Sequence, residues 1–262
     1  MPIVSVAGRG IRYELSGRAG APVLMFANSL GTSLEMWDAQ AAALSNAFAI
    51  LRFDARGHGG SDPDGGPATI ADFVDDAIAV LDAAGCERAH FIGLSLGGLV
   101  AQAAAVQAPD RILSIVVCAT AAAFRPATMW DQRATAVLQT GIDPFVAPSG
   151  ERWFTPAFRQ AHPETVEGAL GMLRRTDPAS YAACCRVLRD TDLRPALPAL
   201  NVPTLTIAGA NDPSTPPAQL AEIAALVKGA RSVVLPDAAH MLAIEQPEAT
   251  TREIRAFVQS LA

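Results

Sequence analysis

Short apolar runs alternate along the chain with segments of helical character. The run at 22–27 is continuous, which is typical of a strand buried on both faces of a sheet, and 49–53 is expected to be another buried strand. Further strands are expected at 91–94, 112–119, 204–208 and 232–235. In residues 4–15, apolar and polar residues alternate on both sides of Gly8-Arg9-Gly10, which predicts an antiparallel hairpin of two further strands. Helices are expected between the runs, at 34–44, 70–84, 95–109, 218–227 and 248–261. The alternation predicts an α/β fold with a mostly parallel eight-stranded sheet and helices on both faces.

The strand pattern disappears between residues 121 and 195. This segment holds helical fragments interrupted by prolines, and the alternation of strands and helices resumes after it. We therefore expect residues 1–120 and 196–262 to form one core domain, with 121–195 inserted into it as a helical cap.

Composition narrows the class of protein. Half of the 262 residues are hydrophobic, enough for a large core, and the net charge of −6 argues against a nucleic-acid partner. Neither a signal-peptide pattern nor an apolar run long enough to span a membrane is present, so the sequence favours a cytoplasmic protein, a monomer or a small homo-oligomer, without a membrane partner. The four cysteines lack the spacing of a zinc site and the histidines lack ligand spacing, so we expect reduced thiols and neither a metal nor a cofactor.

The segment 91–100 contains Gly93-Leu94-Ser95-Leu96-Gly97, which follows an apolar strand and precedes a helical pattern. In that context, Gly-x-Ser-x-Gly is typical of a nucleophilic serine held on a sharp turn between a strand and a helix. The alternative is a glycine-rich turn with a solvated serine. The flanking strand and helix favour Ser95 as a nucleophile.

A serine nucleophile needs a base to take its proton and an acid to orient that base. Of the four histidines, His240 follows the last predicted strand and should emerge at the same sheet edge as Ser95. Asp212 follows the preceding strand and fits the chain order Ser, Asp, His. Its alternative role is an Asx turn before Pro213, and Asp237 is a weaker candidate for the acid.

A tetrahedral intermediate carries an oxyanion, which backbone N–H groups can stabilise. The donors expected are the N–H of Leu96, directly after the nucleophile, and that of Leu30, in the loop after the early buried strand.

The combined motifs resemble the α/β-hydrolase family over the full length, and more specifically its 3-oxoadipate enol-lactonases. The resembling segments are Asn28-Ser29-Leu30-Gly31-Thr32, Met36-Trp37-Asp38, Asp54-Ala55-Arg56-Gly57-His58-Gly59, the residues around Ser95, Arg152-Trp153-Phe154-Thr155-Pro156-Ala157-Phe158 and Tyr181-Ala182-Ala183-Cys184-Cys185. The apolar Met241-Leu242-Ala243-Ile244 departs from the more polar residues of that family. The resemblance implies hydrolysis of the enol-lactone of aromatic catabolism to 3-oxoadipate.

This lactone is a small anion, and the resemblance implies Trp130 and Arg133 as substrate-binding residues. Between 121 and 195 nine arginines face eight acidic residues, so this segment is slightly positive in a chain of net charge −6. The alternatives are that Trp130 packs within the cap and that Arg133 is solvated. Other activities on the same fold also remain open: a general carboxylesterase, a C–C hydrolase, a perhydrolase, or a ligand-binding protein.

Overall fold

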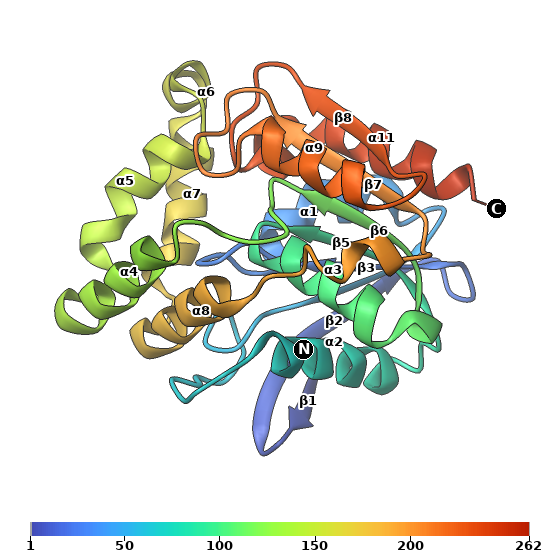
Figure 1. Cartoon of the computed structure of the whole chain (residues 1–262), viewed down its shortest axis with the longest axis horizontal. Helices are drawn as coiled ribbons and strands as arrows, with labels where there is room; N and C mark the ends of the chain where they lie inside the picture. Colours follow the sequence, from blue (N-terminus) through green and yellow to red (C-terminus); the bar gives the residue numbers. More distant parts are fainter. Residues whose placement is uncertain (1, 262) are drawn as a thin grey trace.

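The computed structural model describes residues 2–261, and its centre is one eight-stranded sheet (Figure 1). The strands are β1 (Ile3–Val6), β2 (Arg9–Gly17), β3 (Val23–Ala27), β4 (Ala49–Phe53), β5 (Ala89–Leu94), β6 (Ile112–Cys118), β7 (Thr204–Gly209) and β8 (Arg231–Leu235). Their order across the sheet is β1-β2-β4-β3-β5-β6-β7-β8. The predicted mostly parallel, eight-stranded α/β fold is confirmed.

Strand direction determines which loops meet. The β1–β2 hairpin is antiparallel, and β2 joins β4 antiparallel, whereas β3 to β8 pair with one another only in parallel. The loops after β3, β5, β7 and β8 therefore leave the same edge of the sheet. These four loops carry Leu30, Ser95, Asp212 and His240.

Helices connect the parallel strands. In chain order the core helices are α1 (Asp38–Leu44), α2 (Ile70–Ala83), α3 (Leu96–Gln107), α9 (Pro217–Leu226), α10 (Leu242–Glu245) and α11 (Pro247–Gln259), with 3₁₀ turns at Leu34–Trp37, Pro109–Arg111 and Leu197–Ala199. In Figure 1, α2, α3 and α9 lie in front of the sheet. Behind it, α1 packs against α11, so that helices cover both faces.

Five consecutive helices separate β6 from β7: α4 (Ala127–Thr140), α5 (Asp143–Trp153), α6 (Pro156–Ala161), α7 (Pro163–Arg174) and α8 (Pro178–Asp190). They lie together beside the sheet, at the left of Figure 1, where α4 packs on α8 and α5 on α7. The helices α6, α7 and α8 begin at a proline, which is tolerated in the first helical turn, whereas Pro148 lies inside α5. The division into a core and a cap stays a prediction.

The central strands are almost free of solvent contact. Leu24, Met25 and Phe26 of β3 and every residue of β5 are buried, as continuous apolar runs predict. One predicted element differs from the structure: the helix at 34–44 is a 3₁₀ turn followed by α1. Trp37, at the junction, has φ −102° and ψ 10° and is fully buried against Phe26, because the bend brings the indole into the core.

Candidate active site

Ser95 occupies a strained turn between β5 and α3. Its φ of 56° and ψ of −112° are rare for a residue with a side chain. The turn is held by hydrogen bonds on both sides: the Ser95 N–H donates to the Cys118 carbonyl (2.9 Å), and the Ser95 carbonyl accepts from Thr120 Oγ1 (2.7 Å). Strain retained by such surroundings is a common mark of a functional residue.

Two glycines allow the strand and helix to approach each other at this turn. A Cβ on Gly93 would lie 2.1 Å from the Gly97 carbonyl oxygen, and one on Gly97 would lie 2.3 Å from the Ala27 carbonyl oxygen. Both obstacles are backbone atoms, which cannot rotate away as a side chain could. The Gly-x-Ser-x-Gly spacing therefore has a direct packing cause.

We expect Gly97→Ala to lower the free energy of unfolding by about 3 kcal/mol, because the added methyl group would push α3 away from β3. The matched control is Gly168→Ala on α7, where a Cβ meets no atom within 4 Å. That change should stabilise the protein by about 0.5–1 kcal/mol, since alanine favours a helix. Urea unfolding followed by circular dichroism measures both. Equal stability of the Gly97 variant and the wild type would contradict the packing explanation.

Ser95 and His240 line the same cavity, whose volume is about 360 Å³. Both residues are nearly buried, with exposed fractions of 6% and 3%. Leu30 also contributes to the wall, together with residues of α4, α5 and α8. The cavity thus lies between the sheet edge and the inserted helices.

His240 contacts Asp212 in the way that a catalytic base requires. Its Nδ1 lies 2.8 Å from Asp212 Oδ2. Since a carboxylate only accepts hydrogen bonds, Nδ1 carries the proton and Nε2 keeps its lone pair for another donor. The pair therefore presents a base to the cavity that Ser95 also lines.

Asp212 makes the Asx turn that was its alternative role, and orients His240 at the same time. Its Oδ1 accepts from the backbone N–H groups of Ser214 (2.7 Å) and Thr215 (3.1 Å), which leaves Oδ2 for His240 and Thr215 Oγ1 (2.6 Å). Asp237, the weaker candidate, is exposed. Thr215 was not predicted from the sequence.

The surroundings of Asp212 keep it charged. Burial by itself would raise the pKa of this carboxyl group, but the hydrogen bonds from His240 and Thr215, and the charge of His240 when it is protonated, outweigh burial and lower the pKa. An ionised carboxylate at this position stabilises the imidazolium that forms when His240 takes a proton.

The apolar residues after His240 have a structural explanation. Met241, Leu242 and Ala243 are fully buried, and the Met241 N–H donates to the Trp153 carbonyl (2.9 Å). The Glu245 carboxylate accepts from the N–H of Ala239 (2.7 Å) and from that of Thr155 (2.9 Å). The His240 loop is thereby attached to the end of α5 through Glu245, a contact that the sequence did not reveal.

The predicted oxyanion donors differ in what the structure shows of them. Leu96 is the first residue of α3, so its N–H has no acceptor within the helix. Leu30 lies in a tight turn in which Thr32 donates to the Ser29 carbonyl through both N–H (3.1 Å) and Oγ1 (2.8 Å). Leu30 lines the cavity, and Leu96 adjoins Ser95 in the chain.

Trp130 and Arg133, on α4, both line this cavity. The Arg133 guanidinium lies over the Trp130 ring, 5.2 Å from its centroid, and the buried Trp130 Nε1–H has no hydrogen-bond partner among the described residues. Trp130 also packs against Phe124. The same side chain therefore packs within the segment 121–195 and lines the cavity. Arg133 is half-buried instead of solvated.

Arg152, on α5, is a second cation in the wall that sequence reasoning missed. Its Nη2 donates to Ser149 Oγ (3.0 Å). Burial, and then the charge of Arg133, lower the pKa of Arg152, as expected where two cations share a confined space. No described residue of the cavity wall is Asp or Glu. The site therefore has an excess of positive charge.

The remaining histidines lie outside this cavity. His90 Nδ1 contacts Ser114 Oγ (2.8 Å) in the core, and His162 is exposed against Phe158. His58 is buried beneath the loop that contains Leu30. Among residues 2–261, no group of three or more His, Cys, Asp or Glu side chains could hold a metal ion, and all four cysteines are unpaired. Within the same range no helix could cross a membrane.

The turn at Ser95, the Asp212–His240 pair and the parallel sheet are features of one class of enzyme. Residues 24–253 match the model of the alpha/beta hydrolase family, and the chain belongs to that family. It is a hydrolase, as its sequence predicts.

Particular relatives narrow the comparison. The chain is 36% identical to 3-oxoadipate enol-lactonase 2 of Acinetobacter baylyi over 249 residues, and this alignment covers 95% of this chain and 93% of that protein. The structure of the enol-lactonase from Burkholderia xenovorans LB400 superimposes with a TM-score of 0.96 at 37% identity, covering 98% of this chain and 100% of that one. The crystal structure of a hydrolase from Pseudomonas aeruginosa PA01 superimposes with a TM-score of 0.95 at 42% identity, covering 98% of this chain and 97% of that one. The resemblance to enol-lactonases is confirmed.

Proposed function

We propose that the protein hydrolyses 3-oxoadipate enol-lactone to 3-oxoadipate, a step in the breakdown of aromatic compounds. The observation that carries the proposal is the cavity itself. It joins Ser95 and His240 to three arginines, Arg125, Arg133 and Arg152, with no carboxylate among the described residues of its wall. Such a site suits a small ester that bears a negative charge. The near full-length similarity to enol-lactonases supports the same substrate.

In the proposed mechanism, Ser95 Oγ attacks the lactone carbonyl while His240 Nε2 takes its proton. The N–H groups of Leu30 and Leu96 stabilise the oxyanion. The carbon–oxygen bond of the ring then breaks as His240 Nε2 returns its proton to the leaving enolate, and the enol so formed becomes the ketone. Water, deprotonated by His240, cleaves the acyl-enzyme and releases the dicarboxylate.

We assign the carboxylate arm of the substrate to Arg133 and Arg152. The contacts of both guanidinium groups are with neutral partners, the Trp130 ring and Ser149 Oγ, so their charge remains available to an anion. The unpartnered Trp130 Nε1–H adds a third donor. Guanidinium forks bind carboxylates with two parallel hydrogen bonds, which gives affinity and orientation together.

We expect Arg152→Met, like Arg133→Met, to raise KM for the enol-lactone about 10- to 100-fold, the loss of one charged hydrogen bond. Because the arginines contact a part of the substrate that does not react, kcat should change little. KM for a neutral ester such as p-nitrophenyl acetate should stay within about threefold. Steady-state kinetics with both substrates measures these effects.

Arg125→Met provides the matched control. Arg125 lines the same cavity, but it is paired with Asp192 (3.2 Å), a carboxylate that also binds Arg194. Its replacement should leave KM for the lactone within about threefold. A wild type that prefers the neutral ester to the lactone would contradict the proposed function.

A further inference from the structure

His58 lies in the glycine-rich turn after β4 and uses both of its ring nitrogens. It is 1% exposed. Nδ1 lies 2.8 Å from the Arg56 carbonyl oxygen, and Nε2 lies 3.0 Å from the backbone nitrogen of Gly31. Gly31 directly follows Leu30, the proposed oxyanion donor. A buried imidazole therefore contacts the loop on which the proposed chemistry depends.

The two contacts define the state of the imidazole. The Gly31 N–H can only donate, so Nε2 must accept, and the Arg56 carbonyl can only accept, so Nδ1 must carry the proton. His58 is thus a neutral imidazole with one donor and one acceptor, both used. Burial lowers its pKa to about 4, which keeps it neutral near pH 7.

The turn that contains Leu30 packs against α7 and is held by hydrogen bonds on two sides. Gly31 has φ +81°, and a Cβ at this position would lie 2.5 Å from Leu173 Cδ1 of α7. The hydrogen bonds between Thr32 and Ser29 close the turn on one side. On the other side, the hydrogen bond from the Gly31 N–H to His58 Nε2 fixes the peptide bond between Leu30 and Gly31.

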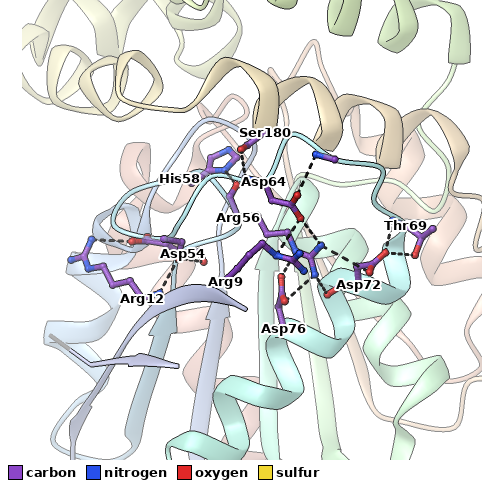
Figure 2. A network of polar contacts seen from close by, with 12 residues as sticks. Arg9, Arg12, Asp54, Arg56, His58, Asp64, Thr69, Asp72, Asp76 and Ser180 are labelled. Carbon is purple, nitrogen blue, oxygen red and sulfur yellow. Dashed lines mark hydrogen bonds and ion pairs between the residues drawn. The ribbon is translucent and has the colours of Figure 1, made fainter. Parts of the chain in front are cut away.

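His58 is itself held by a network of charged residues (Figure 2). The Arg56 guanidinium binds Asp76 (Nη2 to Oδ1, 2.9 Å) and Asp64 (Nη1 to Oδ2, 3.2 Å). Above it, the Asp64 N–H donates to Ser180 Oγ of α8 (2.8 Å). These contacts hold Arg56 in place, and its carbonyl oxygen in turn accepts the hydrogen bond from His58 Nδ1.

We propose that His58 is a positioning residue, whose Nε2 holds Gly31 so that the neighbouring Leu30 N–H is directed at the carbonyl oxygen of the bound substrate. This inference rests on the proposed function, in which Leu30 stabilises the oxyanion. His58 contacts no reacting atom. Its effect should therefore be on the transition state, through Leu30, and little on the binding of the substrate.

Two conservative variants separate the contacts of His58. In His58→Gln the carboxamide oxygen can take the position of Nε2 and accept from Gly31. In His58→Asn the shorter side chain can reach the Arg56 carbonyl but not Gly31. We expect His58→Asn to lower kcat for the lactone about 100-fold with KM within about threefold, as for a lost oxyanion donor. The variant His58→Gln should retain kcat within about fivefold.

Steady-state kinetics on the whole protein measures the split between kcat and KM, thermal unfolding monitors stability, and labelling of Ser95 by a fluorophosphonate counts intact sites. Equal losses of kcat in His58→Asn and His58→Gln would overturn the positioning role, as would a loss confined to KM or to stability.

If His58→Asn fails to fold, the comparison of His58→Gln with His58→Ala decides, and kcat of His58→Gln should be the higher of the two. A wild type that turns over no lactone and leaves Ser95 unlabelled would refute the proposed function instead.

Discussion

Replacing Ser95 by alanine is expected to lower kcat for the enol-lactone by a factor of about 10⁴ to 10⁶, because the acyl-enzyme can no longer form. The fold should persist, since the turn is held by the Ser95 backbone, whose N–H donates to the Cys118 carbonyl and whose carbonyl accepts from Thr120 Oγ1, and the Ser95 hydroxyl takes no part in these bonds. Kinetics with enzymatically generated lactone measures the loss. Mass spectrometry after fluorophosphonate treatment should show one adduct on the wild type and none on the variant.

Ser214→Ala is the control for this experiment. Ser214 lines the same cavity, but its contact with Asp212 is made by its backbone N–H, which the substitution keeps. It should retain kcat within about threefold. Turnover by Ser95→Ala above about 1% of the wild-type rate would exclude Ser95 as the nucleophile.

Asp212→Asn is expected to lower kcat about 10³- to 10⁴-fold while KM changes little. The N–H groups of Ser214 and Thr215 point at Oδ1 and require an oxygen there, so the new amide group must stand at the position of Oδ2. From there it donates to His240 Nδ1 and moves the imidazole proton to Nε2. The imidazole then cannot take a proton from Ser95.

The control is Asp237→Asn, on the exposed acid that the sequence left as the alternative. Its kcat should equal that of the wild type. Circular dichroism checks that both variants keep the fold. A large loss with Asp237→Asn and none with Asp212→Asn would reverse the assignment of the acid.

Much of the fold follows from the sequence because its signals are local. Apolar runs predict the central strands, since strands of a covered parallel sheet have no polar face. The last strand, β8, lies at the edge of the sheet and is largely exposed. The Gly93 and Gly97 spacing indicates the turn at Ser95 for an equally local reason, the close approach of α3 to β3. The positions of Asp212 and His240 follow once strand direction places their loops at one edge.

The residues that the sequence did not reveal act through contacts between distant segments. Arg152 gains its place because α4 and α5 line one cavity, and Glu245 gains its place from its bonds to Ala239 and Thr155. His58 looks like an ordinary turn residue until Gly31 is placed above it. In each case the partner lies far along the chain, and no periodicity or spacing pattern points to it.

The cavity is built from two sources: the sheet edge contributes Ser95 and His240, and the helices between β6 and β7 contribute Trp130, Arg133 and Arg152. Substitutions in those helices could redirect the enzyme to other esters without disturbing the proton transfers at the sheet. Chemistry and selectivity can therefore evolve at separate rates in this chain, and new activities are most readily sought by varying α4 and α5.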